Sequence, residues 1–217
     1  MAIKRFDRGD KGAIHIEDFA QVFGIYPDGK YRDATYHRIA GVLGIETGDA
    51  DVAEFIRRLV FSTLIGNADM HLKNWSLIYL DGRTPTLSPA CDLLSTIPYI
   101  PDETMALKYS RTKRMTEFSK DELKHLAAKA KLSEKLVLDT ATETIERFKE
   151  IWPAEKGNLP LEEKVVGIID AHAASIPIYS DTPVTELAKL MREHDIGAIP
   201  IGEDDQLIGV VTDRDIV

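Results

Sequence analysis

The sequence predicts a mainly α-helical domain that contains one β-hairpin, followed by a small α/β module. Apolar residues recur at every third or fourth position in several long segments, which is typical of amphipathic helices. One apolar, aromatic run, 75–80, is followed by the turn pair Asp81-Gly82. Near the C-terminus the pattern changes to short apolar runs around one helical segment. We therefore place the two domains at residues 1–175 and 176–217.

The composition describes a chain that can bury a core and that carries excess negative charge. Of its 217 residues 44% are hydrophobic, and 36 Asp and Glu against 27 Lys and Arg give a formal charge of −9. We expect that the chain binds neither nucleic acid directly nor an anionic membrane. The single cysteine, Cys91, excludes an intrachain disulfide and a cysteine-based zinc site. Residues 1–10 are charged and no run of about 18 apolar residues occurs, so a cytoplasmic protein is expected.

The N-terminal quarter predicts short elements before one long helix. Residues 3–8 predict a strand that enters a larger fold, and 18–23 predict a helix that ends at Gly24. Residues 26–29 have the composition of a turn. From 51 to 65 the apolar positions follow the helical period, so this segment is the clearest helix of the chain.

A polar segment and a hairpin follow the long helix. The segment 66–74 is dense in residues that can perform chemistry, and the strand 75–80 comes directly after it. The return strand of the hairpin is expected at about 84–88. The hairpin should therefore bring Asp92 back beside the polar segment.

The second half of the first domain predicts three helices. Ser119 and Glu122 have the spacing of a capping box at the start of the first. The next helix starts after Ser133 and is expected to end at Pro153. The third is expected at about 161–174.

Four residues of the polar segment and the hairpin have the order that phosphoryl transfer requires. One carboxylate must accept the proton of the substrate hydroxyl, while an amide oxygen and a second carboxylate hold Mg²⁺ against the nucleotide phosphates. Asp69 would be the catalytic base, and Asn74 and Asp92 the metal ligands, since hard oxygen ligands suit Mg²⁺. Lys73 could place positive charge beside the transferred phosphoryl group.

Each of these residues, taken alone, is also compatible with a purely structural role. Asp, Asn and Lys in a polar segment are often turn formers or solvated residues. His71 could contact a nucleotide, or it could be satisfied by backbone groups. Cys91 is interpreted as a small packing residue. The order of the residues, together with the hairpin, favours the catalytic interpretation.

The segment 66–74 resembles the catalytic loop of HipA-type serine/threonine kinases, the toxins of type II toxin-antitoxin systems. The resemblance covers about residues 3 to 175. Four further motifs fall in matching order, namely Arg5-Phe6-Asp7-Arg8, Lys30-Tyr31, Leu87-Ser88-Pro89 and Asp92-Leu93-Leu94-Ser95.

The resemblance implies a protein-kinase-like C-lobe that phosphorylates Ser or Thr of a protein, for example an aminoacyl-tRNA synthetase, with ATP and Mg²⁺. It also implies a DNA-binding antitoxin as partner. Residues 4–6 would form the hinge strand that touches adenine. The nucleotide-binding residues that the resemblance implies are Arg5, Phe6, His71, Lys73, Asn74 and Asp92.

The chain departs from the family pattern in two ways. Cys91 stands where the family usually has an aromatic residue before the metal-binding Asp. No phosphate-covering loop and no strand lysine precede Ile3, although both position the phosphates in a kinase. We therefore expect an incomplete kinase whose N-lobe is absent.

A short strand after Ile176, a helix at 185–193 and apolar runs at 198–201 and 207–211 give the order β-α-β-β, which indicates a separate small module. Its motifs resemble part of a CBS motif, namely Thr182-Pro183-Val184, Ile196-Gly197-Ala198-Ile199-Pro200 and Gly209-Val210-Val211-Thr212-Asp213-Arg214-Asp215. The resemblance implies that Thr212 contacts phosphate and Asp215 ribose, with dimerisation through this module. Capping of the last helix would account for the same residue types. The alternative function is a non-catalytic protein that senses adenine nucleotides or binds a partner.

Overall fold

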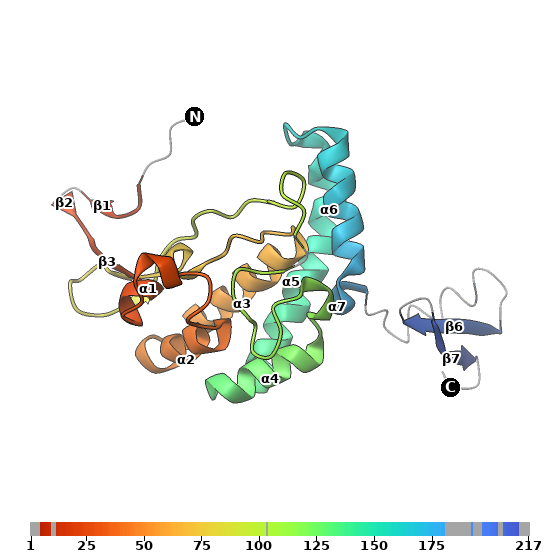
Figure 1. Cartoon of the computed structure of the whole chain (residues 1–217), viewed down its shortest axis with the longest axis horizontal. Helices are drawn as coiled ribbons and strands as arrows, with labels where there is room; N and C mark the ends of the chain where they lie inside the picture. Colours follow the sequence, from red (N-terminus) through yellow and green to blue (C-terminus); the bar gives the residue numbers. More distant parts are fainter. Residues whose placement is uncertain are drawn as a thin grey trace. The chain divides into compact units, whose positions relative to one another are not determined.

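The structure of the chain is a computed structural model. The chain divides into two compact units, residues 1–179 and 180–217. Figure 1 shows the elements along the chain, with helices dominating the first unit. Among the described helices none combines the length and the apolar character that crossing a bilayer requires. The structure describes residues 5–9, 12–102, 104–180, 192, 197–203 and 206–212.

The strands of the first unit form two small antiparallel sheets. The pair β1 and β2 is a hairpin, and β3, β4 and β5 form a sheet in that order. The predicted hairpin is therefore present as β4 and β5, and β3 adds a strand that the sequence pattern did not predict. The strands are β1 Arg8–Gly9, β2 Gly12–Ala13, β3 His15–Asp18, β4 Ser76–Tyr79 and β5 Thr86–Leu87.

The strand predicted at 3–8 is wrong over its described part. Phe6 and Asp7 form a turn, and the strand begins only at Arg8. The Asp7 carboxylate accepts hydrogen bonds from Arg5 Nε at 2.8 Å and from Arg8 Nη1 at 2.7 Å. Because both arginines bind one carboxylate between them, they favour a compact local conformation over an extended one. Lys4 lies outside the described residues.

The helices supply most of the core. The predicted helices at 51–65, after Ser119, after Ser133 and at 161–174 correspond to α3, α4, α5 and α6. The α-helices are α1 Phe19–Val22, α2 Tyr36–Glu46, α3 Asp49–Leu64, α4 Lys120–Ala130, α5 Glu134–Glu155, α6 Glu163–Ser175 and α7 Pro177–Ser180. Short 3₁₀ turns are η1 Pro27–Gly29, η2 Leu72–Asn74, η3 Met115–Glu117 and η4 Lys156–Asn158.

Helix α2 was not predicted because two glycines lower its intrinsic helix propensity. The glycines have a packing role, since α2 lies against α4. A Cβ atom on Gly41 would lie 3.6 Å from the Ala130 carbonyl oxygen, and one on Gly44 would lie 2.5 Å from a Leu132 methyl group. Tertiary packing therefore stabilises a helix that the local sequence disfavours.

Two further predictions at the end of the first unit need correction. The short strand predicted after Ile176 is wrong over its described part, because Pro177–Ser180 form α7, with proline at its first position, where no backbone N–H is needed. The Ile178 N–H donates to the Phe118 carbonyl at 3.3 Å, which holds this turn on the core. Helix α5 continues past Pro153 to Glu155.

The core of the first unit surrounds helix α3, which packs against α5 and α2. Trp75, just before β4, is 1% exposed, and its ring lies 4.6 Å from that of Phe55 and 6.3 Å from that of Tyr36. The aromatic contacts fix the hairpin to α2 and α3. The polar segment between α3 and β4 is thus anchored at both ends by buried side chains.

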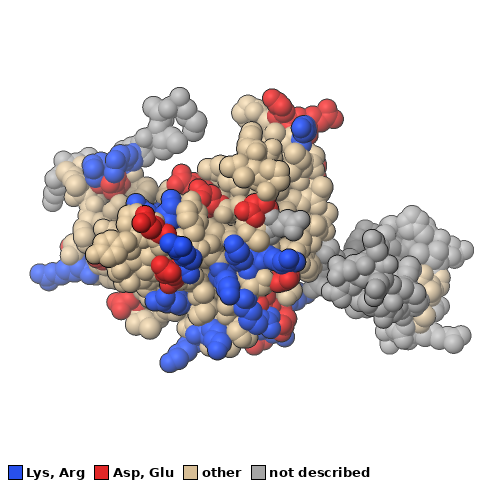
Figure 2. All heavy atoms as spheres, viewed as in Figure 1, with Lys and Arg blue, Asp and Glu red and all other residues tan. Residues whose placement is uncertain are grey.

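Charges of both signs cover the visible face of the first unit. Figure 2 shows Lys and Arg side chains gathered over the lower part of this face, where Figure 1 draws α4, with Asp and Glu among them. An acidic chain therefore still presents local positive charge.

The described part of the second unit is an antiparallel pair, β6 Ala198–Glu203 and β7 Gln206–Thr212. These strands correspond to the predicted runs at 198–201 and 207–211. The helix predicted at 185–193 lies outside the described residues apart from Arg192.

Glu122 has a structural role that differs from the predicted capping box. The Ser119 hydroxyl accepts the Glu122 N–H at 3.3 Å, so the box is half formed. The Glu122 carboxylate belongs to a residue that is 1% exposed, and it accepts the backbone N–H groups of Ser110 and Arg111 at 2.9 and 2.8 Å. It also accepts from Arg111 Nε at 2.7 Å. A buried carboxylate thus holds the segment before α4.

We expect Glu122→Gln to lower the free energy of unfolding by about 2–3 kcal/mol, because an amide N–H₂ would face the donors that the carboxylate now satisfies. Chemical denaturation measures this loss. The control is Asp121→Asn, whose exposed carboxylate binds the same Arg111 at 2.6 Å. Its loss of stability should be much smaller than that of Glu122→Gln, as for exposed ion pairs. Equal losses in both variants would contradict the assigned role.

Candidate active site

The polar segment 66–74 is held by the chain that follows the hairpin. Gly66 has φ 66° and ends α3 with its carbonyl turned to accept the N–H groups of Thr96 and Ile97 at 3.1 and 3.3 Å. The Thr96 hydroxyl donates to the same carbonyl at 3.1 Å and accepts the Ala68 N–H at 2.9 Å. One threonine therefore ties the start of the segment to the region after Asp92.

Asp69 presents its carboxylate at the surface of this segment. The residue is exposed, and its Oδ1 accepts a hydrogen bond from the Tyr31 hydroxyl at 2.8 Å. The Asp69 carbonyl accepts the His71 N–H at 2.7 Å and the Asn74 Nδ2 at 2.8 Å. The backbone of Asp69 is thus satisfied locally, which leaves the carboxylate for other chemistry.

Asn74 is buried, at 8% exposure, and its Nδ2 donates a hydrogen bond to the Asp69 carbonyl. Its Oδ1 receives no hydrogen bond from the part of the chain that the structure describes. An amide oxygen in this state is a suitable hard ligand for a cation.

Asp92 lies in the left-handed backbone region, with φ 53°, which is uncommon for residues other than glycine. Its carbonyl accepts Asn67 Nδ2 at 2.7 Å and the Leu94 N–H at 3.1 Å, and these bonds hold the turn. The Asp92 side chain is exposed and makes no ion pair with a described residue. The Cys91 thiol donates to the Asn74 carbonyl at 3.4 Å, so the residue before Asp92 lies against Asn74.

His71 is a buried imidazole beside the Lys30 ammonium. It is 7% exposed, and burial lowers its pKa, as does the nearby Lys30 ammonium, whose Nζ lies 2.9 Å from His71 Nε2. The charges of Asp69 and Asp92 both act on the ring in the opposite direction and raise its pKa.

The remaining predicted residues lie in different places. Lys73 is exposed within η2, next to Asn74. Arg5 binds Asp7, and Phe6 is part of the turn before β1. Thr212 ends β7 in the second unit, and Asp215 lies outside the described residues.

Four residues of the site were not assigned a role from sequence. Lys30 and Tyr31 belong to a motif of the resemblance, but nothing local signals that they contact the 66–74 segment. Asn67 and Thr96 form hydrogen bonds that join the two ends of the site. The side-chain hydrogen bonds of these residues to the other parts of the site span 25 to 41 positions of sequence, which pattern analysis does not detect.

A cavity of about 450 Å³ opens beside Asp69. It reaches Asp69 and Tyr31, whereas Asn74 and Asp92 are not among its walls. Asp69 is therefore accessible from a side that the proposed metal ligands do not line. The cavity is lined by Tyr31, Ala68, Asp69, Thr96, Ile100, Asp102, Thr104, Met105, Ala106 and Lys113.

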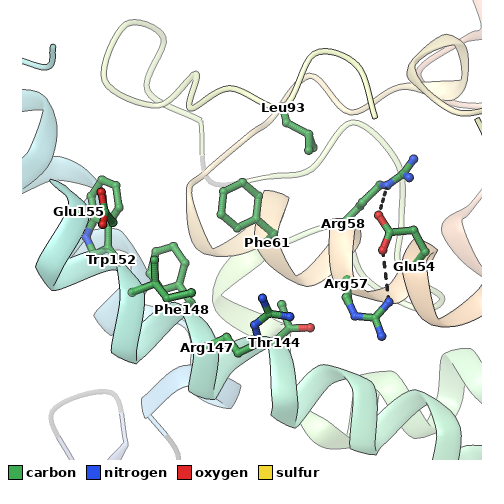
Figure 3. A pocket seen from close by; sticks show the side chains of 11 residues that line it. Glu54, Arg57, Arg58, Phe61, Leu93, Thr144, Arg147, Phe148, Trp152 and Glu155 are labelled. Atoms are coloured by element: carbon green, nitrogen blue, oxygen red, sulfur yellow. Dashed lines mark hydrogen bonds and ion pairs between the residues drawn. The ribbon is translucent and has the colours of Figure 1, made fainter. Parts of the chain in front are cut away.

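A second hollow, of about 350 Å³, lies between α3 and α5 and is mainly apolar. Figure 3 shows Leu93 on one side of it and Phe148 and Trp152 on another, with Phe61 between. Two arginines at its rim share one carboxylate, since Glu54 binds Arg57 at 3.2 Å and Arg58 at 2.7 Å. The hollow contains none of the predicted site residues.

The candidate ligands Asn74 and Asp92 offer an amide oxygen and a carboxylate, donor types that Mg²⁺ takes in proteins. Within the described residues no group of three or more His, Cys, Asp and Glu side chains could hold a metal ion. Mg²⁺ commonly takes one or two protein oxygens and completes its shell with water and phosphate. Asn74 and Asp92 match that pattern.

Two family models match the chain. The model for the HipA-like C-terminal domain matches residues 1–152, and the model for the CBS domain matches residues 172–217.

Relatives with curated names cover the chain to different extents. The protein named "Putative kinase Y4dM" of Sinorhizobium fredii is 69% identical over 182 residues, which is 83% of this chain and 44% of that protein. "Hypoxic response protein 1" of Mycobacterium tuberculosis is 66% identical over 35 residues, 16% of this chain and 24% of that protein. The part of each of these relatives that this chain matches is thus less than half of that relative's length.

A similar solved structure comes from Shewanella oneidensis, where HipA is in complex with HipB and its operator DNA. The similarity has a TM-score of 0.65 at 19% identity and covers 89% of this chain and 48% of that chain. At this identity the likeness concerns the fold.

We expect Gly66→Ala to destabilise the chain by about 2–5 kcal/mol, because a left-handed alanine is strained and a new Cβ meets a packed side chain. That Cβ would lie 2.4 Å from Ile97 Cδ1 and 2.9 Å from Cγ2, so both branches of Ile97 obstruct it. The control is Gly82→Ala, at φ 77° with nothing within 4 Å, which should cost about 1–2 kcal/mol. Thermal unfolding of both variants tests the difference, and identical stabilities would refute the packing argument.

Proposed function

Since the chain belongs to the HipA-like C-terminal domain family, we propose that it is the catalytic lobe of a protein serine/threonine kinase that uses ATP and Mg²⁺. The observation that carries the proposal is the arrangement of Asp69, Asn74 and Asp92. Asn74 Nδ2 donates to the Asp69 carbonyl, the Cys91 thiol next to Asp92 donates to the Asn74 carbonyl, and Asn67 Nδ2 donates to the Asp92 carbonyl.

In the proposed reaction Asp69 is the base. Its carboxylate accepts the proton of the acceptor hydroxyl as that oxygen attacks the γ-phosphorus. Tyr31 holds Oδ1 of this carboxylate at 2.8 Å, and the other oxygen carries no hydrogen bond from a described residue. The acceptor segment of the protein substrate would enter the cavity beside Asp69.

The proposed cation site uses Asn74 Oδ1 and the Asp92 carboxylate. When bound, Mg²⁺ supplies positive charge that neutralises the nucleotide phosphates. The left-handed turn at Asp92 and the burial of Asn74 hold the two ligands in place. Lys73, exposed beside Asn74, would add charge near the transferred group.

Partners belong to the same proposal. HipA of Shewanella oneidensis is in complex with HipB and operator DNA, and we propose that a DNA-binding antitoxin also binds this chain. The proposed substrate is Ser or Thr of a translation-linked protein such as an aminoacyl-tRNA synthetase. We propose a cytoplasmic location, in line with these partners.

A second candidate function is favoured by the match of residues 172–217 to the CBS domain model. In it, this module senses adenine nucleotides through Thr212 and Asp215 or mediates dimerisation, and catalysis is lost. The two functions differ in which variant abolishes nucleotide binding.

We expect transfer of radiolabelled γ-phosphate by this chain to fall about 10²–10⁴-fold in Asp69→Asn, because the proton acceptor is lost while the side-chain shape is kept. Binding of Mg²⁺-ATP, measured by calorimetry, should be unchanged in that variant. Transfer that persists in Asp69→Asn would exclude Asp69 as the base.

We expect Asp92→Asn to abolish the Mg²⁺ dependence of ATP binding, because the charged ligand is lost. Thr212→Ala serves as the comparison. If ATP binding survives Asp92→Asn but disappears in Thr212→Ala, the CBS-like module binds the nucleotide and the kinase proposal fails.

A further inference from the structure

Lys30 places a positive charge in the candidate site without an ion-pair partner among the described residues. It follows the tight turn η1, and its carbonyl accepts the Leu72 N–H at 3.3 Å, so its backbone is bonded directly to the catalytic segment. The side chain is partly buried. An ammonium group held in such a place is positioned by the fold, unlike a solvated surface lysine.

The nearest partner of the ammonium is neutral. Its Nζ lies 2.9 Å from His71 Nε2, and an ammonium group can only donate, so Nε2 must be the acceptor. The imidazole then carries its proton on Nδ1, which has no hydrogen-bond partner among the described residues, and the ring is uncharged.

The second partner is also neutral. Lys30 Nζ lies 4.8 Å from the centroid of the Tyr31 ring, a cation–π contact. Within the described residues Lys30 makes no ion pair with a carboxylate. One N–H of the ammonium is used on His71, which leaves two donors for another acceptor.

The chemistry of that acceptor follows from the surrounding groups. Asp92 and Asn74 are the proposed cation ligands, and an ammonium bonded to the same 66–74 segment suits the oxyanions that the cation brings. Lysine is a common phosphate ligand because its compact charge fits phosphate oxygens from many directions. A carboxylate ligand would fit Lys30 equally, but it would compete with Asp92 for the same cation.

We propose that Lys30 binds the polyphosphate of the nucleotide, as a phosphate ligand contributed from outside the 66–74 segment. This inference rests on the proposed function and adds a residue to it. His71 is then a positioning residue, since it holds the ammonium rather than the nucleotide.

The test measures binding of inorganic tripolyphosphate, of Mg²⁺-ATP and of adenosine to the full chain by calorimetry. Lys30→Met should lower the affinity for tripolyphosphate and for Mg²⁺-ATP about tenfold or more, the size expected when a charge-assisted hydrogen bond is lost. Adenosine affinity should be unchanged, because it has no phosphate. Lys30→Arg should retain most of the affinity for tripolyphosphate.

The matched control is Lys124→Met, which removes the same charge from the exposed face of α4. It should leave all three affinities within about twofold, since exposed charges at a distance are screened. If Lys30→Met behaves like Lys124→Met while Mg²⁺-ATP still binds, the inference is overturned and the proposed function stands. If Lys30→Met lowers the affinity for adenosine as much as that for tripolyphosphate, Lys30 has a structural role and the inference is overturned. If the unaltered chain binds neither phosphate compound, both proposals fail.

Discussion

The candidate site depends on the hydrogen bonds between Thr96 and the start of the polar segment. A segment of this kind contains backbone groups that Asp and Asn side chains readily satisfy, and they would then be lost to chemistry. Here the Thr96 hydroxyl satisfies both the Gly66 carbonyl and the Ala68 N–H. Asn67 satisfies the Asp92 carbonyl in addition. The side chains of Asp69 and Asp92 are therefore not needed to hold the backbone.

Two further carboxylates of the chain have purely structural roles. Hydrogen bonds from the Thr84 and Arg83 backbone lower the pKa of Asp81 to about 2, and this residue closes the turn of the hairpin. Glu122 satisfies three N–H donors and is buried. These acids stabilise the fold. The exposed Asp92 carboxylate makes no such bond with a described residue, so it differs from them in having its oxygens available to a ligand.

The sequence predicted the long helices and the hairpin because burial imposes a period on their apolar residues. It failed where tertiary contacts decide the conformation. Glycines let α2 approach α4, two arginines bind Asp7 in a turn, and Ile178 fixes α7 to the core. For the site, residue types and order indicated Asp69, Asn74 and Asp92, and their roles stay predictions. Lys30 and Tyr31 could not be predicted, because only the folded chain brings them to the polar segment.

The pair Lys30 and Tyr31 couples the proposed base to the proposed phosphate site. Tyr31 donates to Asp69, and this bond raises the pKa of the Tyr31 phenol, so the phenol stays a donor at neutral pH. Lys30, the preceding residue, bonds to His71 in the same segment. Two consecutive residues of one loop thus contact the polar segment 66–74 at two points. The ring of Tyr31 also lies 5.1 Å from that of His71 and 4.8 Å from the Lys30 ammonium. A shift of this loop would therefore move Tyr31, the partner of the proposed base, together with Lys30, the proposed phosphate ligand.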